Sequence, residues 1–269
     1  MSLANAAAVL HWLKNDRHDV AVGELATAMG WPKSSTSRLL SQMQKLGLLE
    51  RDPVTRRYRV GLMMLELGRH YRADEPLVEA ADAELVELTR RTGHSTGISL
   101  LDGINVVVLR SRPGTHPLRV VTPPGTRGPA WANSTGRMLL ARLDDAEIAR
   151  RFTPFPTLPG SNAPATLEKL MQRIARARAQ GWDESQDESL PGISGVSIAI
   201  DDPHGAPSFA IYVAFSSMQV SRAERRELVQ MLFEIEARLR AKFGTTPYIS
   251  PDQSTSTYMA SRLQRRAHG

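Results

Sequence analysis

The sequence predicts an α+β protein, in which an N-terminal winged helix-turn-helix domain precedes an antiparallel sheet with packed helices. Two observations predict it. Helical periodicity dominates the first 75 residues, whereas strands and helices occur in separate runs from residue 76 to residue 243. Asp74-Glu75-Pro76 lies between the regions, with the proline well placed for a first helical turn. We divide the 269 residues into an N-terminal domain, a linker helix, a C-terminal domain and a basic tail, at 1–61, 62–75, 76–243 and 244–269.

The first domain is expected to contain three helices. Apolar residues recur at helical spacing from Ala6 to Leu13, and a second run from Gly23 to Met29 ends at Gly30. A third helix should cover residues 33–46, with hydroxyls of its first turn as caps and an apolar stripe facing inward. The predicted caps are Ser34, Ser35 and Thr36, and the stripe is Leu39, Leu40, Met43 and Leu46.

A hairpin should follow the third helix. Residues 48–51 and 57–60 have the composition of strands, and the Asp52-Pro53-Val54-Thr55-Arg56 stretch between them is a turn. Helix, helix, turn, helix and hairpin together define a winged helix-turn-helix.

The polar side of the third helix carries the strongest chemical signal. The second helix of a helix-turn-helix enters the major groove, with long polar side chains near its start free to reach the bases. We expect phosphate contacts from Lys33, Ser34 and Ser35, and base contacts from Thr36, Ser37, Arg38 and Gln42. The hairpin should place Arg56 and Arg57 at its tip and Arg59 along a strand, where they can follow phosphates.

The charge distribution fits a DNA partner. Residues 1–61 hold nine Lys and Arg against five Asp and Glu, whereas residues 62–243 hold 22 of each kind. A basic excess confined to one module is typical of a phosphate-binding surface. A small helical domain that binds protein, with solvated arginines, is the alternative.

The linker helix is apolar around more of its circumference than one small domain can cover. Five large apolar side chains follow one another closely in residues 62–72, namely Leu62, Met63, Met64, Leu65 and Leu67. We therefore expect a partner to bury this helix.

The C-terminal domain mixes both periodicities. Strands are predicted at 95–101, 105–111, 118–122, 196–200 and 208–215, the first two joined by Asp102-Gly103. Helices are predicted at 134–143, with Asn133 as cap, and at 144–152, 166–180 and 221–243.

No catalytic or metal site emerges from the residues. The chain has no cysteine, and its seven histidines are scattered, so we expect no cofactor and no bound metal. Gly93-His94-Ser95-Thr96-Gly97 matches the nucleophile elbow of hydrolases, but a helix enters it and a strand leaves it, which is the reverse of the required order. The acidic residues Asp183, Glu184, Asp187 and Glu188 are expected in a solvated loop.

The chain is expected to act in the cytoplasm. No apolar run approaches the 18 residues that a membrane span needs, and the first 13 residues lack a basic segment of an export signal.

Five segments resemble transcription regulators of the IclR family. They are the helix-turn-helix from Gly23 to Leu40, the hairpin with Tyr58-Arg-Val-Gly61, the helix with Leu65-Glu-Leu-Gly68, the segment Pro129 to Ala141, and the segment Gly181 to Gly192. The resemblance covers about residues 2–243. It implies a homodimer or dimer of dimers, a winged helix on double-stranded operator DNA, and a GAF-like domain that holds a small effector, often an organic acid.

Departures from the family pattern concern the effector. If the corresponding positions line the pocket, its residues are Trp131, Asn133, Ser134, Thr135, Gly195, Ser197, Tyr212 and Ala214. Trp131 stands where the family usually has His, and Tyr212 and Ala214 replace paired serines, which favours a ligand with an aromatic or apolar body. Trp131 and Tyr212 are equally compatible with simple core packing.

Taken together, the residues predict a DNA-binding transcription regulator controlled by a small organic or aromatic acid, and not an enzyme. Two alternatives stay open: a ligand-binding enzyme with an accessory winged helix, and a ligand-sensing protein–protein adaptor.

Overall fold

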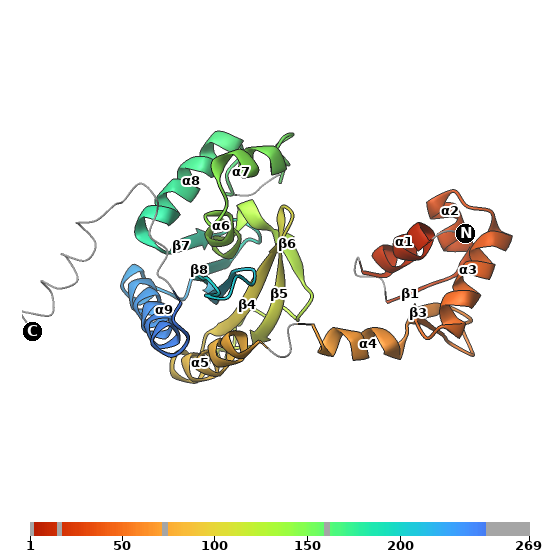
Figure 1. Ribbon diagram of the computed structural model, residues 1–269, viewed down its shortest axis with the longest axis horizontal. Helices are drawn as coiled ribbons and strands as arrows, with labels where there is room; N and C mark the ends of the chain where they lie inside the picture. Colours follow the sequence, from red (N-terminus) through yellow and green to blue (C-terminus); the bar gives the residue numbers. More distant parts are fainter. Residues whose placement is uncertain (1–2, 15–17, 72–74, 159–161, 246–269) are drawn as a thin grey trace, which may run out of the picture. The chain divides into compact units, whose positions relative to one another are not determined.

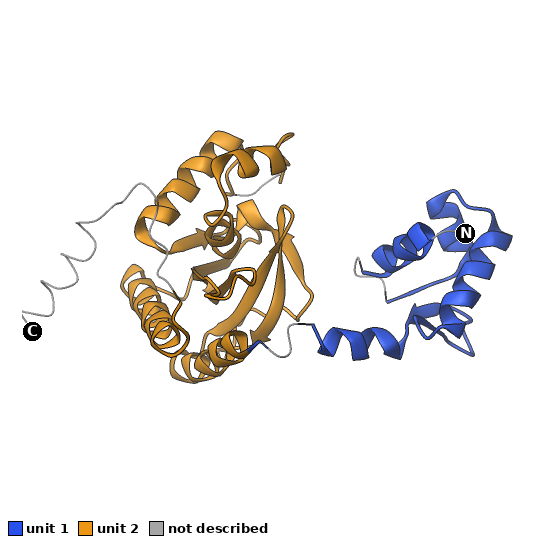
Figure 2. Ribbon diagram, in the orientation of Figure 1, with its two compact units in different colours: residues 1–75 blue, residues 76–269 orange. Residues whose placement is uncertain are grey.

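The computed structural model describes residues 3–14, 18–71, 75–158 and 162–245 (Figure 1). The chain divides into two compact units, residues 1–75 and 76–269 (Figure 2). The described elements of unit 1 are α1 (Leu3–Lys14), β1 (Asp19–Val20), α2 (Val22–Met29), α3 (Lys33–Lys45), β2 (Leu49–Arg51), β3 (Tyr58–Val60) and α4 (Leu62–Arg69).

Unit 1 is built around one small core. Its three short strands pair antiparallel in the order β1-β3-β2 and pack with α1, α2 and α3. The buried apolar side chains of this core are Val9, Leu13, Val20, Leu25, Leu39, Leu40, Met43, Leu49 and Tyr58. Gly30 ends α2 with a φ of +65°, a conformation that glycine adopts without strain and that turns the chain toward α3. The helix-turn-helix and its hairpin therefore form one folded module.

Unit 2 contains a six-stranded antiparallel sheet in the order β6-β5-β4-β9-β8-β7. Its described elements are α5 (Pro76–Thr92), β4 (Ser95–Asp102), β5 (Asn105–Arg112), β6 (Arg127–Pro129), the 3-10 helix η1 (Ala130–Ala132), α6 (Ser134–Leu140), α7 (Asp145–Arg151), α8 (Leu167–Gln180), β7 (Asp183–Gln186), β8 (Ile193–Ile200), β9 (Phe209–Ser216) and α9 (Arg222–Phe243). The predicted α+β class is confirmed.

Helices cover both faces of this sheet (Figure 1). On one face α5 and α9 pack side by side over Ile98, Ile198 and Ile211. The opposite face is covered by η1, α6 and α8, and its core includes Ala199 and Ala210. Because side chains alternate along a strand, residues two apart from Ala199 and Ala210 also lie on this second face. That alternation places the predicted effector residues of β8 and β9 beneath α6.

Three sequence predictions need correction. Residues 118–122 form no strand; instead β6 pairs with β5. Pro117 and Pro123 flank the segment and lack the N–H groups that a ladder needs, and the carbonyl of Val120 accepts a hydrogen bond from the Ser95 hydroxyl at 2.6 Å. The linker helix ends at Arg69, and the rest of its predicted range lies partly outside the described residues.

The third correction concerns the acidic segment at 183–188. It begins with strand β7, and both Asp183 and Glu188 are buried. The predicted tail from residue 246 onward lies outside the described residues. Among the helices that the structure describes, none is long and apolar enough to cross a membrane.

Candidate nucleic-acid interface and effector site

Helix α3 begins directly after Pro32 and buries one stripe of side chains. Thr36 belongs to that stripe with Leu39, Leu40 and Met43, and its hydroxyl donates to the Pro32 carbonyl at 3.1 Å. The prediction that Thr36 reads bases is therefore wrong for this conformation, because its side chain faces the core. The hydroxyls of the first turn do not cap the helix either, since the position before Lys33 is Pro32.

The opposite side of α3 is open to solvent. Lys33, Ser34, Ser37, Arg38 and Gln42 are exposed, and Ser35 is partly exposed. Within the described residues, neither Lys33 nor Arg38 forms an ion pair, and their charges are not neutralised by a neighbour. Counted over the described residues, this side of α3 therefore presents two unpaired cations beside exposed polar side chains.

The hairpin of β2 and β3, residues 49–60, forms the wing. Asp52 organises its tip: one carboxylate oxygen accepts from the amides of Val54 and Thr55, which lowers the pKa of Asp52. Arg56 follows at a positive φ of 59° and is exposed, and in the part of the chain that the structure describes it forms no ion pair. Arg59 pairs with Glu50 at 3.1 Å.

Arg57 differs from its neighbours in the wing. Its guanidinium contacts the carboxylates of Asp19 and Glu24, both at 2.7 Å, and these two contacts raise the pKa of Arg57. The predicted phosphate ligand is thus already engaged by two acidic side chains.

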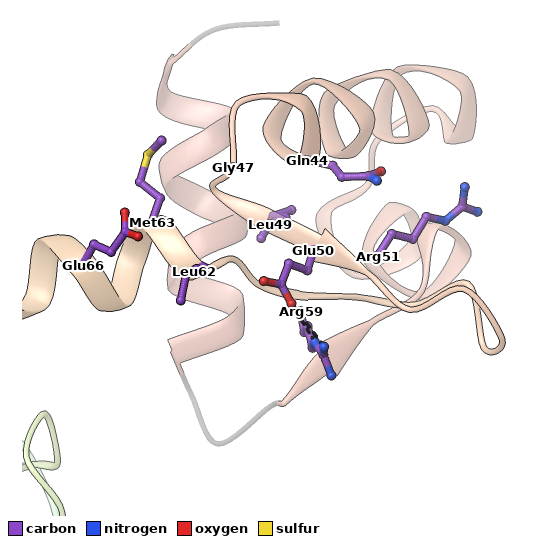
Figure 3. Close-up of a pocket in the computed structure, with 9 residues that line it drawn as sticks. All are labelled: Gln44, Gly47, Leu49, Glu50, Arg51, Arg59, Leu62, Met63 and Glu66. Carbon is purple, nitrogen blue, oxygen red and sulfur yellow. Dashed lines mark hydrogen bonds and ion pairs between the residues drawn. The ribbon is translucent and has the colours of Figure 1, made fainter.

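Helix α4 presents apolar side chains to solvent. Leu62, Leu65 and Leu67 are each more than half exposed, and none of its residues is buried. An open hollow of about 560 Å³ lies between α4, the wing strands and the end of α3 (Figure 3). Leu49, Leu62 and Met63 give it an apolar part, and Glu50, Arg59 and Glu66 give it a charged part.

The predicted effector residues of the sheet form two neighbouring rows. Ser197 of β8 is paired with Tyr212 of β9, and Tyr212 is paired in turn with Gly97 of β4. In the next row Gly195 pairs with Ala214. Cross-strand partners share one face, so these residues lie together on the α6 side of the sheet.

Two features distinguish this part of the sheet. Ser197 is fully buried, and its hydroxyl has no hydrogen-bond partner within the described residues. The side chain of Tyr212 lies across Gly97, and a Cβ added at Gly97 would come within 2.4 Å of the Tyr212 hydroxyl. The Tyr212 hydroxyl also lies 3.2 Å from the hydroxyl of Thr122. Burial raises the pKa of Tyr212, so the phenol is neutral and able to donate.

The start of α6 lies against these rows. Asn133 caps the helix as predicted: its side chain accepts from the Gly136 amide and donates to the Pro129 carbonyl, both at 2.7 Å. Ser134 and Thr135 are buried, and the Ser134 hydroxyl lies 3.8 Å from the Cβ position of Gly195. Trp131 instead packs edge-on against Phe152 and Phe155, with ring centroids 5.9 and 6.2 Å away.

Two family models match most of the chain. The bacterial transcriptional regulator IclR C-terminal model matches residues 70–239, and the IclR helix-turn-helix model matches residues 2–53. The chain belongs to the IclR family. The resemblance stated from the motifs is confirmed, and IclR regulators combine a DNA-binding helix-turn-helix domain with a ligand-binding C-terminal domain.

Individual IclR relatives align over nearly the whole chain. The HTH-type transcriptional regulator KdgR of Escherichia coli is 24% identical over 92% of this chain and 94% of its own length. The IclR regulator of Alicyclobacillus acidocaldarius superposes with a TM-score of 0.75 at 22% identity, over 90% of this chain and 99% of that one. An IclR homologue from Microbacterium hydrocarbonoxydans, solved with 4-hydroxybenzoate, superposes with a TM-score of 0.74 at 21% identity. The match covers 89% of this chain and 99% of the homologue.

One buried ionic cluster of the IclR domain was not predicted from the sequence. Arg137, on α6, is completely buried and contacts the carboxylates of Asp183 and Glu188 as well as the carbonyls of Trp131 and Glu184. Burial raises the pKa of Asp183, and Arg137 and Arg173 oppose that effect. The cluster ties α6, which lies over the predicted effector residues, to β7 and the turn after it.

The hydrolase-like motif has a structural role in this IclR chain. Helix α5 ends at Gly93, which has a φ of +70°, and β4 begins at Ser95. The Ser95 hydroxyl accepts from the Gly114 amide at 2.9 Å while it donates to Val120. Ser95 therefore fastens the loop after β5 to the sheet and does not stand free as a nucleophile would.

Proposed function

We propose that this IclR regulator reads operator DNA with the exposed side of α3 and follows the flanking phosphates with its wing. The observation that carries the proposal is the exposed polar side of α3, where Arg38 and Lys33 form no ion pair with any residue that the structure describes. Arginine is the side chain best suited to contact guanine in the major groove, so Arg38 is the proposed base-reading residue. Ser37 and Gln42 are proposed as its neighbours in that contact.

Replacing Arg38 by alanine is expected to weaken binding to the preferred sequence by about 1–3 kcal/mol. Binding to random DNA should change much less, because a base contact contributes to specificity and a phosphate contact to all sequences. Affinities of the wild type and of Arg38→Ala are measured on a duplex selected from a random pool and on a scrambled duplex of equal length.

Lys45, exposed at the far end of α3, provides the matched control. Lys45→Ala should leave the ratio of the two affinities unchanged. An equal loss on both duplexes for Arg38→Ala would contradict its assignment as a base-reading residue.

Assembly is the second part of the proposal. We propose that two copies of the chain associate through α4, as a homodimer or within a dimer of dimers. The exposed apolar side chains of this helix support the proposal. Two wings and two α3 helices would then address an operator with two related half-sites.

The effector is proposed to bind on the α6 side of the sheet, against Ser134, Thr135, Gly195, Ser197, Tyr212 and Ala214. The hydroxyl of Ser197 is fully buried and has no hydrogen-bond partner in the described part of the chain, which supports a polar ligand there because an unsatisfied buried hydroxyl is costly. Tyr212 supports an aromatic acid, since its ring offers a stacking surface and its neutral phenol a donor. Trp131 is left out of this proposal, because its ring is engaged with Phe152 and Phe155.

Replacing Ser197 by alanine is expected to weaken binding of 4-hydroxybenzoate about tenfold, which corresponds to one lost hydrogen bond. The unfolding free energy of the ligand-free variant should stay equal or rise, because an unsatisfied group is removed. Calorimetric titration and urea unfolding measure the two effects.

Ser194→Ala is the matched control on the same strand. Its hydroxyl is bonded to that of Ser217 at 2.8 Å, so its loss should lower stability and leave ligand affinity unchanged. The effector proposal fails if the wild type releases no heat with 4-hydroxybenzoate or benzoate, or if Ser197→Ala binds 4-hydroxybenzoate as tightly as the wild type.

We also propose that the protein catalyses no reaction and acts on DNA in the cytoplasm. The anchoring role of Ser95 supports the first point, because the best enzymatic motif of the sequence is used for packing.

A further inference from the structure

Arg57 connects three segments that are distant in the sequence. Its Nε lies 2.7 Å from Asp19 Oδ1 and its Nη2 lies 2.7 Å from Glu24 Oε2. Asp19 begins β1, and Glu24 lies in the first turn of α2, where its carboxylate also accepts from the amide of Ala21 at 3.4 Å. One guanidinium thus joins the wing to the start of the helix-turn-helix.

Arg57 lies where its contacts can restrain the orientation of the wing tip. The next residue, Tyr58, is buried in the core of unit 1 and pairs with both β1 and β2. On the other side, the Arg57 carbonyl accepts from the amide of Asp52 at 2.9 Å, which closes the turn at the wing tip. Arg57 therefore stands at the point where the hairpin leaves the core, and its guanidinium restrains the direction of the tip.

The charge of this cluster disfavours a phosphate. Asp19, Glu24 and Arg57 together carry one net negative charge, and an approaching phosphate would meet both carboxylates. Arg56, one residue earlier, is exposed and forms no ion pair within the described residues. Two adjacent arginines of the wing therefore have opposite surroundings.

We infer that Arg57 is a positioning residue for DNA binding: it holds the wing against Asp19 and Glu24, whereas Arg56 supplies the phosphate contact. The inference rests on the proposed DNA interface. It assigns to Glu24 and Asp19 a part in DNA binding, although both carry the charge that DNA repels.

The salt dependence of DNA binding separates the two roles. Each phosphate contact contributes about 0.9 to the slope of log Kobs against log salt concentration. Arg56→Ala and Arg57→Ala each remove one positive charge from the same hairpin, so their long-range electrostatic effects are matched. The wild-type protein is first used to select a duplex from a random pool. The slope of log Kobs against log salt concentration is then measured on that duplex for the wild type and both variants.

Arg56→Ala is expected to reduce the slope by about 0.9. Arg57→Ala is expected to weaken binding about three- to tenfold with the slope unchanged, because two surface ion pairs are lost and no counterion release changes. A slope reduced equally by both variants would overturn the inference, and so would wild-type affinity for Arg57→Ala.

Hydrogen exchange without DNA tests the restraint directly. Amides of residues 51–58 should exchange faster in Arg57→Ala than in the wild type, and Arg56→Ala should match the wild type. Unchanged exchange in Arg57→Ala would contradict the positioning role. If the wild type bound no selected duplex, the proposed DNA interface would fail, while this exchange comparison would still decide whether Arg57 restrains the wing.

Discussion

Arg137→Ala is expected to lower the unfolding free energy of unit 2 by about 3–5 kcal/mol. The substitution removes the cation that contacts both buried carboxylates, and it leaves them only the partly exposed Arg173, 3.0 Å from Glu188 and 3.9 Å from Asp183. Loss of one partner of a buried ion pair is among the most destabilising changes known. Nε of Arg137 lies 2.6 Å from Asp183, and its other nitrogens contact Glu188 and two backbone carbonyls. Urea unfolding followed by circular dichroism measures the effect.

Two variants make the Arg137 experiment specific. Arg150→Ala removes an exposed arginine that pairs with Glu147 on α7, and it should cost less than about 1 kcal/mol. Arg137→Lys keeps the charge but cannot reproduce the planar set of contacts, so its stability should lie between those of Arg137→Ala and the wild type. Stability of Arg137→Ala within 1 kcal/mol of the wild type would show that the buried cluster does not hold unit 2 together.

Leu65→Glu is expected to weaken self-association about 100-fold or more, with a parallel loss of operator binding. In the proposed dimer, each copy of this substitution would place a carboxylate in an apolar interface, where its desolvation is not compensated. Leu65 is 64% exposed in the single chain, so the fold of unit 1 itself should tolerate the change. Sedimentation velocity over a concentration series measures assembly.

Leu3→Glu is the matched control for Leu65→Glu. Leu3 is 88% exposed on α1. Leu3→Glu therefore makes the same chemical change at a residue outside α4, and self-association should stay unchanged. A Leu65→Glu variant that retains the association constant of the wild type would contradict the role of α4 in dimerisation.

The helices and the hairpin of unit 1 were predictable because local patterns determine them, whereas the two-residue strand β1 was not predicted. The stripe of Leu39, Leu40 and Met43 predicted α3, and Gly30 marked the end of the helix before it. The same spacing contained the signal that was overlooked at Thr36, which lies three and four residues before Leu39 and Leu40 and is therefore on the buried side.

Ionic contacts between residues far apart in the sequence could not be predicted from the sequence. Arg137 lies 46 residues from Asp183 and 51 from Glu188, and Arg57 lies 38 residues from Asp19. Hydrophobic periodicity reports which side chains face a core, but it does not report which charge enters that core with a partner. The prediction of a strand at 118–122 was wrong for a related reason. Its composition is typical of a strand, but the flanking prolines and the hydrogen bond from Ser95 to Val120 prevent strand pairing.

Cleavage of DNA from a single site on α3 tests the central claim that the exposed side of this helix lies against the bases. The chain has no cysteine, so Ser37→Cys carries the one attachment point for an iron chelate that generates hydroxyl radicals. The account predicts cuts within each half-site of the selected duplex, and none from a chelate at Val86→Cys in unit 2. Uncut half-sites on a duplex that the labelled protein still binds would contradict it.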